Sequence, residues 1–139
     1  MTAKEELLQI RKLDKMLKAT EQEISECRAD IYALQATDYS KERVSGGVAA
    51  DIGDKVEVLM RLEDKASREW HALMNERIRI RTKIDRIENL ELRSVLIQYY
   101  VMQHILEQIA VDMGYTWRHM QRKLNKGLIA YGEANAKMS

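Results

Sequence analysis

The sequence predicts an all-α protein, with a long antiparallel coiled-coil helical hairpin followed by a C-terminal three-helix helix-turn-helix domain. Three observations predict this fold. The 139 residues include no proline or phenylalanine but are rich in leucine, isoleucine, glutamate, lysine and arginine, which favours helix over sheet. Two long stretches carry apolar residues at alternating spacings of three and four, as coiled-coil helices do. A third stretch, near the C-terminus, has a small residue, a turn glycine, a helix N-cap and then an apolar residue that would face the preceding helix, in that order.

The first long helix is expected from Glu5 to about Ala36. At roughly 1.5 Å per residue, it would be roughly 50 Å long. Cys27 lies on its apolar seam and is the only cysteine, which favours a core thiol, excludes an internal disulfide and suits a reducing cytoplasm. Polar Thr20 fills the one gap in the heptad spacing of the seam, whose other members are Ile10, Leu13, Leu17, Ile24, Cys27, Ile31 and Leu34.

Residues 37–53 have a loop-like composition that includes the run SKERVSGG. A connection of this length is unusual in a compact domain. We expect it to be either the mobile tip of the hairpin or a segment that orders on a partner.

A second long helix is expected after this loop, which completes a hairpin over residues 1–88. Trp70 is predicted to pack against small residues of the first helix, and three polar positions, Thr20, Glu63 and Arg77, to set the register. The apolar members of the second seam are Val56, Leu59, Ala66, Trp70, Leu73, Ile80, Ile84 and Ile87. The end of this helix carries a basic run whose charge is offset by nearby acids: Arg77, Arg79, Arg81, Lys83 and Arg86. We interpret the run first as a solvated face and second as an accessory contact to phosphates.

Asn89 and Leu90 interrupt the heptad pattern and begin a domain expected over residues 89–131. The run LRSVLIQYYVMQ predicts a short apolar helix that supplies the core a two-helix motif lacks. Its buried face would comprise Leu92, Val95, Leu96, Tyr99 and Tyr100. Residues 132–139 are expected to form a frayed tail.

The segment from His104 to Leu128 has the spacing of a helix-turn-helix, with His104 at the start of the first helix. Ala110 would lie where the two helices cross, and Gly114, four residues later, allows a tight turn. Thr116 is a natural N-cap for the second helix. The second helix would face the first with Met120, Leu124 and Leu128.

The other faces of this second helix carry side chains that can bind DNA. From Thr116 to Leu128 there are four Lys or Arg residues and no acid, whereas the whole chain has a formal net charge of only +1. Any affinity for nucleic acid must therefore come from local clustering of charge. The residues predicted to contact base edges or phosphates of double-stranded DNA are Arg118, His119, Gln121, Arg122 and Lys126.

Sites of chemistry are not found in the sequence. No His and Cys pairs have zinc spacing, no glycine-rich phosphate loop precedes a helix, and the three histidines, His71, His104 and His119, lie far apart. We therefore expect no enzyme activity, no catalytic residues, no metal site and no cofactor. No apolar run is long enough for a signal peptide or a membrane span, so we expect a soluble protein with no membrane partner.

The run ILEQIAVDMGYTWRHMQRKLNKGL resembles region 4 of the sigma-70 family, which contacts promoter DNA. The match includes the Ile109-Ala110 pair, the turn, Thr116 and the closing Gly127-Leu128. This resemblance implies base or phosphate contacts at Trp117, Arg118, His119, Gln121 and Arg122. Thr116, at the start of the second helix, is also predicted to be a DNA contact. Sigma proteins usually have a basic residue where Trp117 stands and an acid where Arg118 stands, so their base preference does not transfer.

Over nearly its whole length the chain resembles the ArpU-like and RinA-like transcriptional regulators of phages and prophages of Gram-positive bacteria. This resemblance rests on LLQIRKLDKML, RVSGG and ELRSVLIQYYV together with the sigma-like run. It implies a regulator of phage gene expression, of late genes in particular, in the cytoplasm of a bacterial host. We expect a homodimer through the helical hairpin.

Two alternatives stay open. The first is a small DNA-packaging subunit of a phage, similar to a terminase small subunit, which a ring of eight or more copies would favour over a dimer. The second is a protein interaction module that docks on RNA polymerase or on another regulator, which an absence of salt-sensitive DNA binding would favour.

Overall fold

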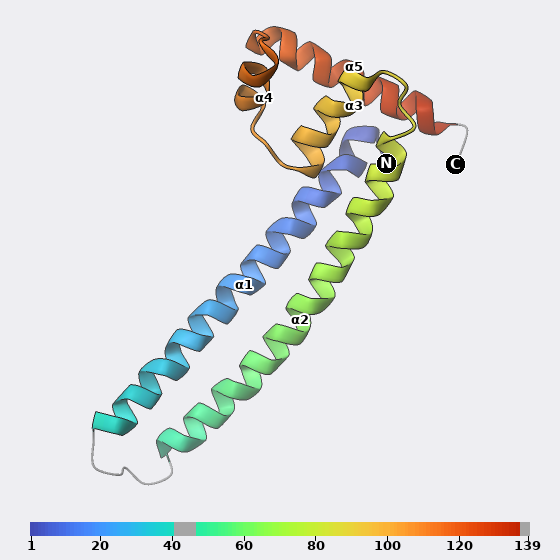
Figure 1. The fold of residues 1–139 in the computed structure, drawn as a ribbon. Helices are drawn as coiled ribbons and strands as arrows, with labels where there is room; N and C mark the ends of the chain where they lie inside the picture. The colour runs from blue at the N-terminus through green and yellow to red at the C-terminus, as the bar shows by residue number, and fades with distance from the viewer. Residues whose placement is uncertain (41–46, 137–139) are drawn as a thin grey trace. The chain divides into compact units, whose positions relative to one another are not determined.

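The protein, seen in a computed structural model that describes residues 1–40 and 47–136, is all-helical over these ranges, as predicted. The helices are α1 (Ala3–Ser40), α2 (Gly47–Ile84), α3 (Leu90–Leu96), the π-helical segment η1 (Ile97–Val101), α4 (Leu106–Met113) and α5 (Trp117–Asn135) (Figure 1). Within the described ranges, no helix combines the length and the apolar character needed to cross a membrane.

The two long helices extend further than the sequence pattern predicted. Each has 38 residues, and together they include residues 37–40 and 47–53 of the expected loop. The prediction of a loop at these positions was wrong, because a solvated helix tolerates glycine at a cost of only about 1 kcal/mol and no proline interrupts the segment. The remainder, 41–46, lies outside the described residues, and so does the prediction of a mobile tip or a partner-bound segment.

The contacts of the chain group into two compact units. One unit comprises residues 14–72, and the other comprises residues 1–13 and 73–139. The sequence pattern suggested a division between residues 88 and 89. In the structure, the start of α1 and the end of α2 share a unit with α3, η1, α4 and α5.

In the unit of residues 14–72, polar contacts join α1 to α2. The Thr20 hydroxyl donates a hydrogen bond to Glu69 Oε1 at 2.6 Å, and the Cys27 thiol donates to the Lys55 carbonyl at 3.4 Å. Lys55 Nζ also lies 3.5 Å from Asp30 Oδ2. From Thr20 to Cys27 the residue number on α1 rises, while that of the partner on α2 falls from Glu69 to Lys55. The two segments therefore run antiparallel here.

The predicted inward positions of α2 are partly wrong. Trp70 is 49% exposed and Val56 is 38% exposed, and Glu63 is exposed, 3.9 Å from the Arg28 guanidinium. Glu69 instead lies beside Thr20. Thr20 itself is only 2% exposed. The inward series is Leu59, Leu62, Ala66, Glu69 and Leu73.

The physical reason is that two series with three and four spacing pass through Leu59, Ala66 and Leu73. One continues through 63 and 70 and the other through 62 and 69, so periodicity alone does not choose between them. The same ambiguity occurs in α1, where Asp14 is 8% exposed while the predicted Leu13 is only half-buried.

In the other unit, α3 and α4 pack on both α5 and η1. Val95, Leu106, Ile109, Ala110 and Met120 form a buried cluster, against which four half-buried side chains pack: Tyr99, Met113, Tyr115 and Leu124. Further buried side chains of this unit are Leu7, Ile10, Leu73, Ile80, Ile84, Ile87, Leu96, Tyr100 and Tyr131.

The connection before α4 differs from the prediction for His104. Gln103 has a φ of 58°, in the left-handed region, and the His104 backbone N–H donates to the Gln98 carbonyl at 2.9 Å. This turn closes the end of η1, so α4 begins only at Leu106, with Ile105 as its N-cap. His104 therefore precedes the helix that it was predicted to begin.

The C-terminal helix does not fray at residue 132, as the sequence suggested. Asn135 is 9% exposed, and its side-chain amide donates to the Lys83 carbonyl at 3.1 Å and to the Tyr131 carbonyl at 2.8 Å. Arg86 Nη1 donates to Asn135 Oδ1 at 2.6 Å. The hydrogen bonds with Lys83 and Arg86 are tertiary and keep α5 helical to Asn135, while residues 137–139 lie outside the described part of the chain.

Candidate nucleic-acid interface

The turn between α4 and α5 is closed by Gly114, as predicted. Gly114 has φ 73° and ψ 29°, a left-handed conformation in which a side chain would be strained. Its backbone N–H donates to the Val111 carbonyl at 3.2 Å, and the Tyr115 N–H donates to the Ala110 carbonyl at 2.9 Å. These bonds end α4, and α5 begins three residues after Gly114.

The two helices pack through the residues the sequence indicated. Ala110 is 5% exposed and Met120 is fully buried, and both belong to the same buried cluster. Further along α5, Gly127 is also buried, and a Cβ at this position would lie only 3.1 Å from Leu96 Cδ2. The requirement for a small residue at Gly127 arises from packing against α3, which the sequence pattern did not predict.

Thr116 is the N-cap of α5, as predicted. Its backbone is extended, and its hydroxyl oxygen accepts a hydrogen bond from the His119 backbone N–H at 3.2 Å. The cap satisfies one of the free amides at the start of α5. Thr116 lies at the N-terminal end of α5, the end of a helix that attracts phosphates. Because Thr116 is exposed, this end is open to a ligand.

Four of the predicted DNA contacts project freely from α5. Arg118, Gln121, Arg122 and Lys126 are exposed, and none of these side chains has a hydrogen-bond or ion-pair partner among residues 1–40 and 47–136. Arg118 and Arg122 are four residues apart and so lie on one face of the helix, away from buried Met120. These side chains keep their full hydrogen-bonding capacity for a ligand.

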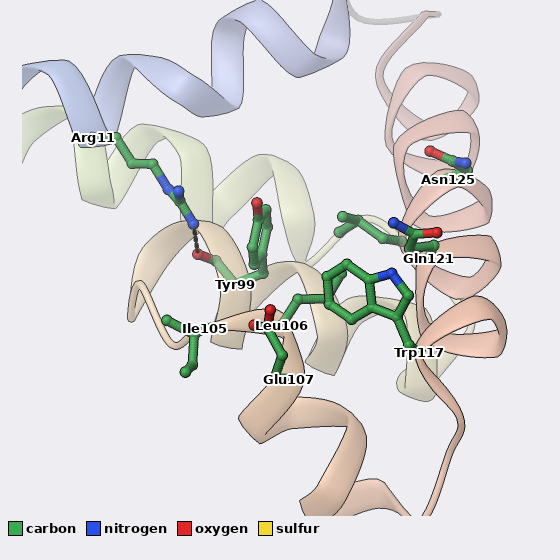
Figure 2. Close-up of a pocket in the computed structure, with 9 residues that line it drawn as sticks. Arg11, Tyr99, Ile105, Leu106, Glu107, Trp117, Gln121 and Asn125 are labelled. Carbon is green, nitrogen blue, oxygen red and sulfur yellow. Dashed lines mark hydrogen bonds between the residues drawn. The ribbon is translucent and has the colours of Figure 1, made fainter.

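The two remaining predicted contacts on α5, His119 and Trp117, have protein neighbours. His119 is half-buried, and the centre of its ring lies 4.5 Å from that of Tyr115, in an edge-to-face arrangement. Trp117 is 44% exposed and lies in an open pocket between α5 and the start of α4 (Figure 2). The residues that line this pocket are Arg11, Tyr99, Ile105, Leu106, Glu107, Trp117, Gln121, Leu124 and Asn125.

Arg11 was not predicted in this region, because it lies in the sequence of the first long helix. Its Nη2 donates to the Tyr99 carbonyl at 3.2 Å, and its guanidinium carbon lies 4.4 Å from the centre of the Tyr99 ring (Figure 2). The two contacts hold the start of α1 on η1. A separation of 88 residues leaves no local signal from which the contact could have been found.

Lys123 is the one cation of the α5 cluster that is already paired. Its Nζ lies 3.0 Å from Glu91 Oε1, and the Tyr115 hydroxyl donates to the same oxygen at 2.7 Å. The hydrogen bond from Tyr115 and then that from Lys123 lower the pKa of Glu91. The hydrogen bond to Glu91 in turn raises the pKa of Lys123. Three free cations therefore remain on α5: Arg118, Arg122 and Lys126.

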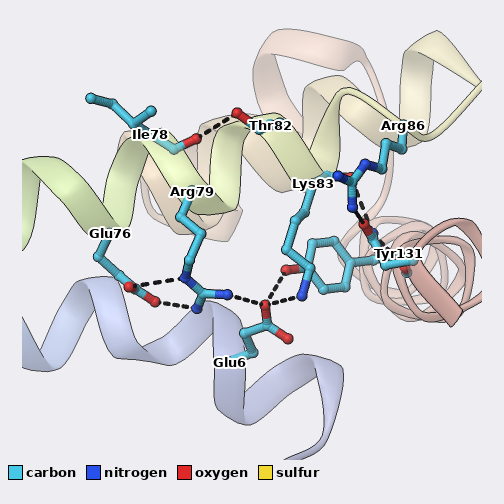
Figure 3. A network of polar contacts seen from close by, with 9 residues as sticks. Glu6, Glu76, Ile78, Arg79, Thr82, Lys83, Arg86 and Tyr131 are labelled. Atoms are coloured by element: carbon cyan, nitrogen blue, oxygen red, sulfur yellow. Dashed lines mark hydrogen bonds and ion pairs between the residues drawn. The ribbon is translucent and has the colours of Figure 1, made fainter. Parts of the chain in front are cut away.

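A polar network centred on Glu6 joins α1, α2 and α5 (Figure 3). Glu6 Oε1 accepts hydrogen bonds from Lys83 Nζ, from Arg79 Nη1 at 3.0 Å and from the Tyr131 hydroxyl at 2.9 Å. Burial raises the pKa of Glu6, but the hydrogen bonds from Lys83, Tyr131 and Arg79 and the charge of Lys83 together lower it below its ordinary value. Arg79 and Lys83 belong to the basic run predicted to be a solvated face. Arg79 is exposed as predicted, and through Glu6 both residues also join α2 to α1.

Comparison with known proteins identifies a family. Residues 33–129, well over half of the 139 residues, match the family described as a protein of unknown function, DUF1492. No curated protein and no solved structure matches the chain. The matched residues extend from α1 to α5 and include Gly114, Thr116 and the exposed cations of α5. The chain therefore belongs to the DUF1492 family.

Proposed function

We propose that this protein is a sequence-specific DNA-binding regulator in which α4 and α5 act as a helix-turn-helix. In this proposal α5 enters the major groove of double-stranded DNA and α4 crosses the phosphate backbone. The observation that carries it is the face of α5 opposite the buried cluster, where Arg118, Arg122 and Lys126 are exposed and have no partner among the described residues.

The local charge of α5 supports the proposal. The chain has a formal net charge of only +1, so the molecule as a whole has little attraction for a polyanion. Between Thr116 and Leu128 there is no acid, and the ion pair of Lys123 with Glu91 leaves three cations free. Guanidinium and ammonium groups on one exposed helix are the groups that bind phosphates and guanine edges.

The remaining helices have a second role in this proposal. Three free cations neutralise few phosphates, so one copy would bind DNA weakly and two copies would bind better. We propose that α1 and α2 form a coiled-coil hairpin through which the protein dimerises. Exposed apolar side chains in the unit of residues 14–72 support a partner surface there; they are Met16, Tyr32, Val56, Val58, Met60 and Trp70.

The resemblance to phage and prophage regulators extends the proposal to the level of genes. It supports the regulation of phage gene expression, with late genes as the first candidates. Its sigma-like part supports promoter DNA as the target.

A genomic selection tests the proposal directly, because it examines DNA binding and identifies the site in one experiment. Fragments of the host and prophage genome are incubated with the full chain, and the bound fraction is sequenced. We expect enrichment of one defined site near a phage gene cluster. A double Arg118→Ala, Arg122→Ala variant is the matched control: it changes two exposed positions, should fold normally and should lose the enrichment. Recovery of all fragments at background frequency by the unchanged protein would refute the proposal.

A further inference from the structure

The outward face of α5 extends beyond the residues that the sequence pattern selected. Arg118, Arg122, Asn125 and Ile129 are spaced by four, three and four residues and therefore form one stripe along the helix. All four are exposed. The stripe lies on the opposite side of α5 from the buried residues Met120, Gly127 and Tyr131.

Asn125 lies near the middle of this stripe with its amide unused. It is exposed, and its side chain has no hydrogen-bond partner in the described part of the chain. Figure 2 shows Asn125 on α5, one turn along from Gln121, at the edge of the open pocket. The cations on either side of it, Arg122 and Lys126, are also exposed and unpaired among the described residues.

Two features limit which side chains of α5 can contact DNA. Within the basic segment, the half-buried His119 packs against Tyr115, and Lys123 is paired with Glu91, so neither projects freely. At its end, Glu133 is exposed one turn after Ile129 and would repel phosphates. Asn125 therefore carries a neutral amide within the segment of α5 that holds the three free cations. This segment ends before Glu133, the first acid of α5.

We infer that Asn125 determines part of the DNA sequence preference by binding an adenine in the major groove. This inference rests on the proposed function. A side-chain amide can donate from its NH₂ group to N7 of adenine while its carbonyl oxygen accepts from the N6 amino group. The two arginines that precede it on the stripe, Arg118 and Arg122, instead match the two acceptors of guanine. Asn125 thus adds an A·T pair to a site that the arginines alone would restrict to guanines.

The spacing of the stripe gives the position of this adenine. Asn125 lies seven residues beyond Arg118, a distance of about 10 Å along the helix axis. Successive base pairs rise by about 3.4 Å along the duplex. With α5 lying along the groove, parallel to the duplex axis, the adenine should therefore lie about three base pairs from the guanine that depends on Arg118.

Selection from random duplexes by the full chain and its variants tests the inference. The unchanged protein should select one site, and Asn125→Ala should select the same site with its preference for adenine lost at one position, from about tenfold or more to near equality. Arg118→Ala should lose its guanine about three base pairs away. Lys126→Ala, in the adjacent position, is the matched control: it should weaken binding to every sequence without changing any base preference.

The outcomes separate the inference from the function on which it rests. If the unchanged protein selects no sequence, both are refuted. If it selects a site and Asn125→Ala selects that site with every base preference intact, DNA recognition stands and the role of Asn125 is refuted. Because Asn125 is exposed and unpartnered, the alanine variant should fold normally, and its circular dichroism spectrum and thermal unfolding check this directly.

Discussion

At the scale of single residues, the structure distinguishes cations that are free from cations that are already used. Lys123 lies within the basic cluster of α5, but it is bound to Glu91 beside the Tyr115 hydroxyl. Arg118, Arg122 and Lys126 have no such partner in the described ranges. A count of basic residues would treat these four side chains as equivalent, whereas their contacts assign them different roles.

Arginine variants should separate base recognition from phosphate contact. Arg118→Ala or Arg122→Ala should cost about 1 to 3 kcal/mol on the selected site and much less on random DNA, because a bidentate contact with guanine is lost. Lys126→Ala should weaken both alike and reduce the salt dependence of binding by about one phosphate contact. Fluorescence anisotropy titrations over a range of salt concentrations measure these effects. Equal losses on both DNAs for all three variants would mean that α5 contacts only the backbone.

At the scale of helices, the turn into α5 depends on one backbone conformation. Gly114 has a φ of 73°, and a Cβ there would meet no atom within 4 Å, so any cost of substitution comes from backbone strain and not from a clash. Thr116 then caps α5. The direction in which α5 leaves the turn therefore depends on the backbone conformation of a residue that has no side chain to pack.

Gly114→Ala should destabilise the protein by about 1 to 2 kcal/mol, because alanine is strained in the left-handed conformation. Gly132→Ala is the matched control, since Gly132 lies in α5 with nothing within 4 Å of a Cβ and no positive φ. That variant should gain about 0.5 to 1 kcal/mol from helix propensity. Urea denaturation followed by circular dichroism measures both free energies. Destabilisation of similar size by the two substitutions would contradict the role assigned to Gly114.

The Glu6 network makes part of the stability depend on pH. The pKa of Glu6 is lowered in the folded protein from its ordinary value of 4.5, so folding favours the carboxylate. This contribution is fully present above pH 4.5 and is lost as the pH falls through the lower, folded pKa. The carboxylate also accepts three hydrogen bonds from α2 and α5.

Glu6→Gln should therefore cost about 1 to 3 kcal/mol at neutral pH, because an amide replaces a hydrogen-bonded carboxylate. It should also flatten the fall in stability below pH 4.5. Glu23→Gln, which changes an exposed glutamate on α1, serves as the control and should follow the unchanged protein. Urea titrations at a series of pH values provide the test, and parallel stability curves for Glu6→Gln and the unchanged protein would rule out this role of Glu6.

At the scale of the whole molecule, the proposed function requires more than one copy of α5 on the DNA. We expect a homodimer at micromolar concentration, assembled through α1 and α2, because a single set of three free cations would bind DNA weakly. Sedimentation equilibrium of the full chain measures the mass. Trp70→Glu places a charge at a residue that is 49% exposed and should weaken the association. A monomeric mass at micromolar concentration would overturn the dimer, and a ring of eight or more copies would favour the packaging alternative.

The sequence by itself determined the helix ends and the sharp turn that depend on neighbouring residues. The N-cap at Thr116, the left-handed Gly114 and the start of α3 after Asn89 each depend on hydrogen bonds or dihedral angles within a few residues. Such interactions are encoded by neighbouring residue types, so the helices and the sharp turn could be predicted. The candidate contacts on α5 follow from the same helical spacing.

Only the tertiary structure decided which side chains face inward and which cations stay free. Glu69, and not Trp70, lies beside Thr20, because two equivalent spacings fit the sequence and only a partner helix chooses between them. Lys123 is paired because Glu91, 32 residues earlier, reaches its ammonium group. α5 stays helical to Asn135 because the side chain of that residue binds α2. Each of these outcomes depends on atoms distant in sequence, whose proximity exists only once the chain has folded.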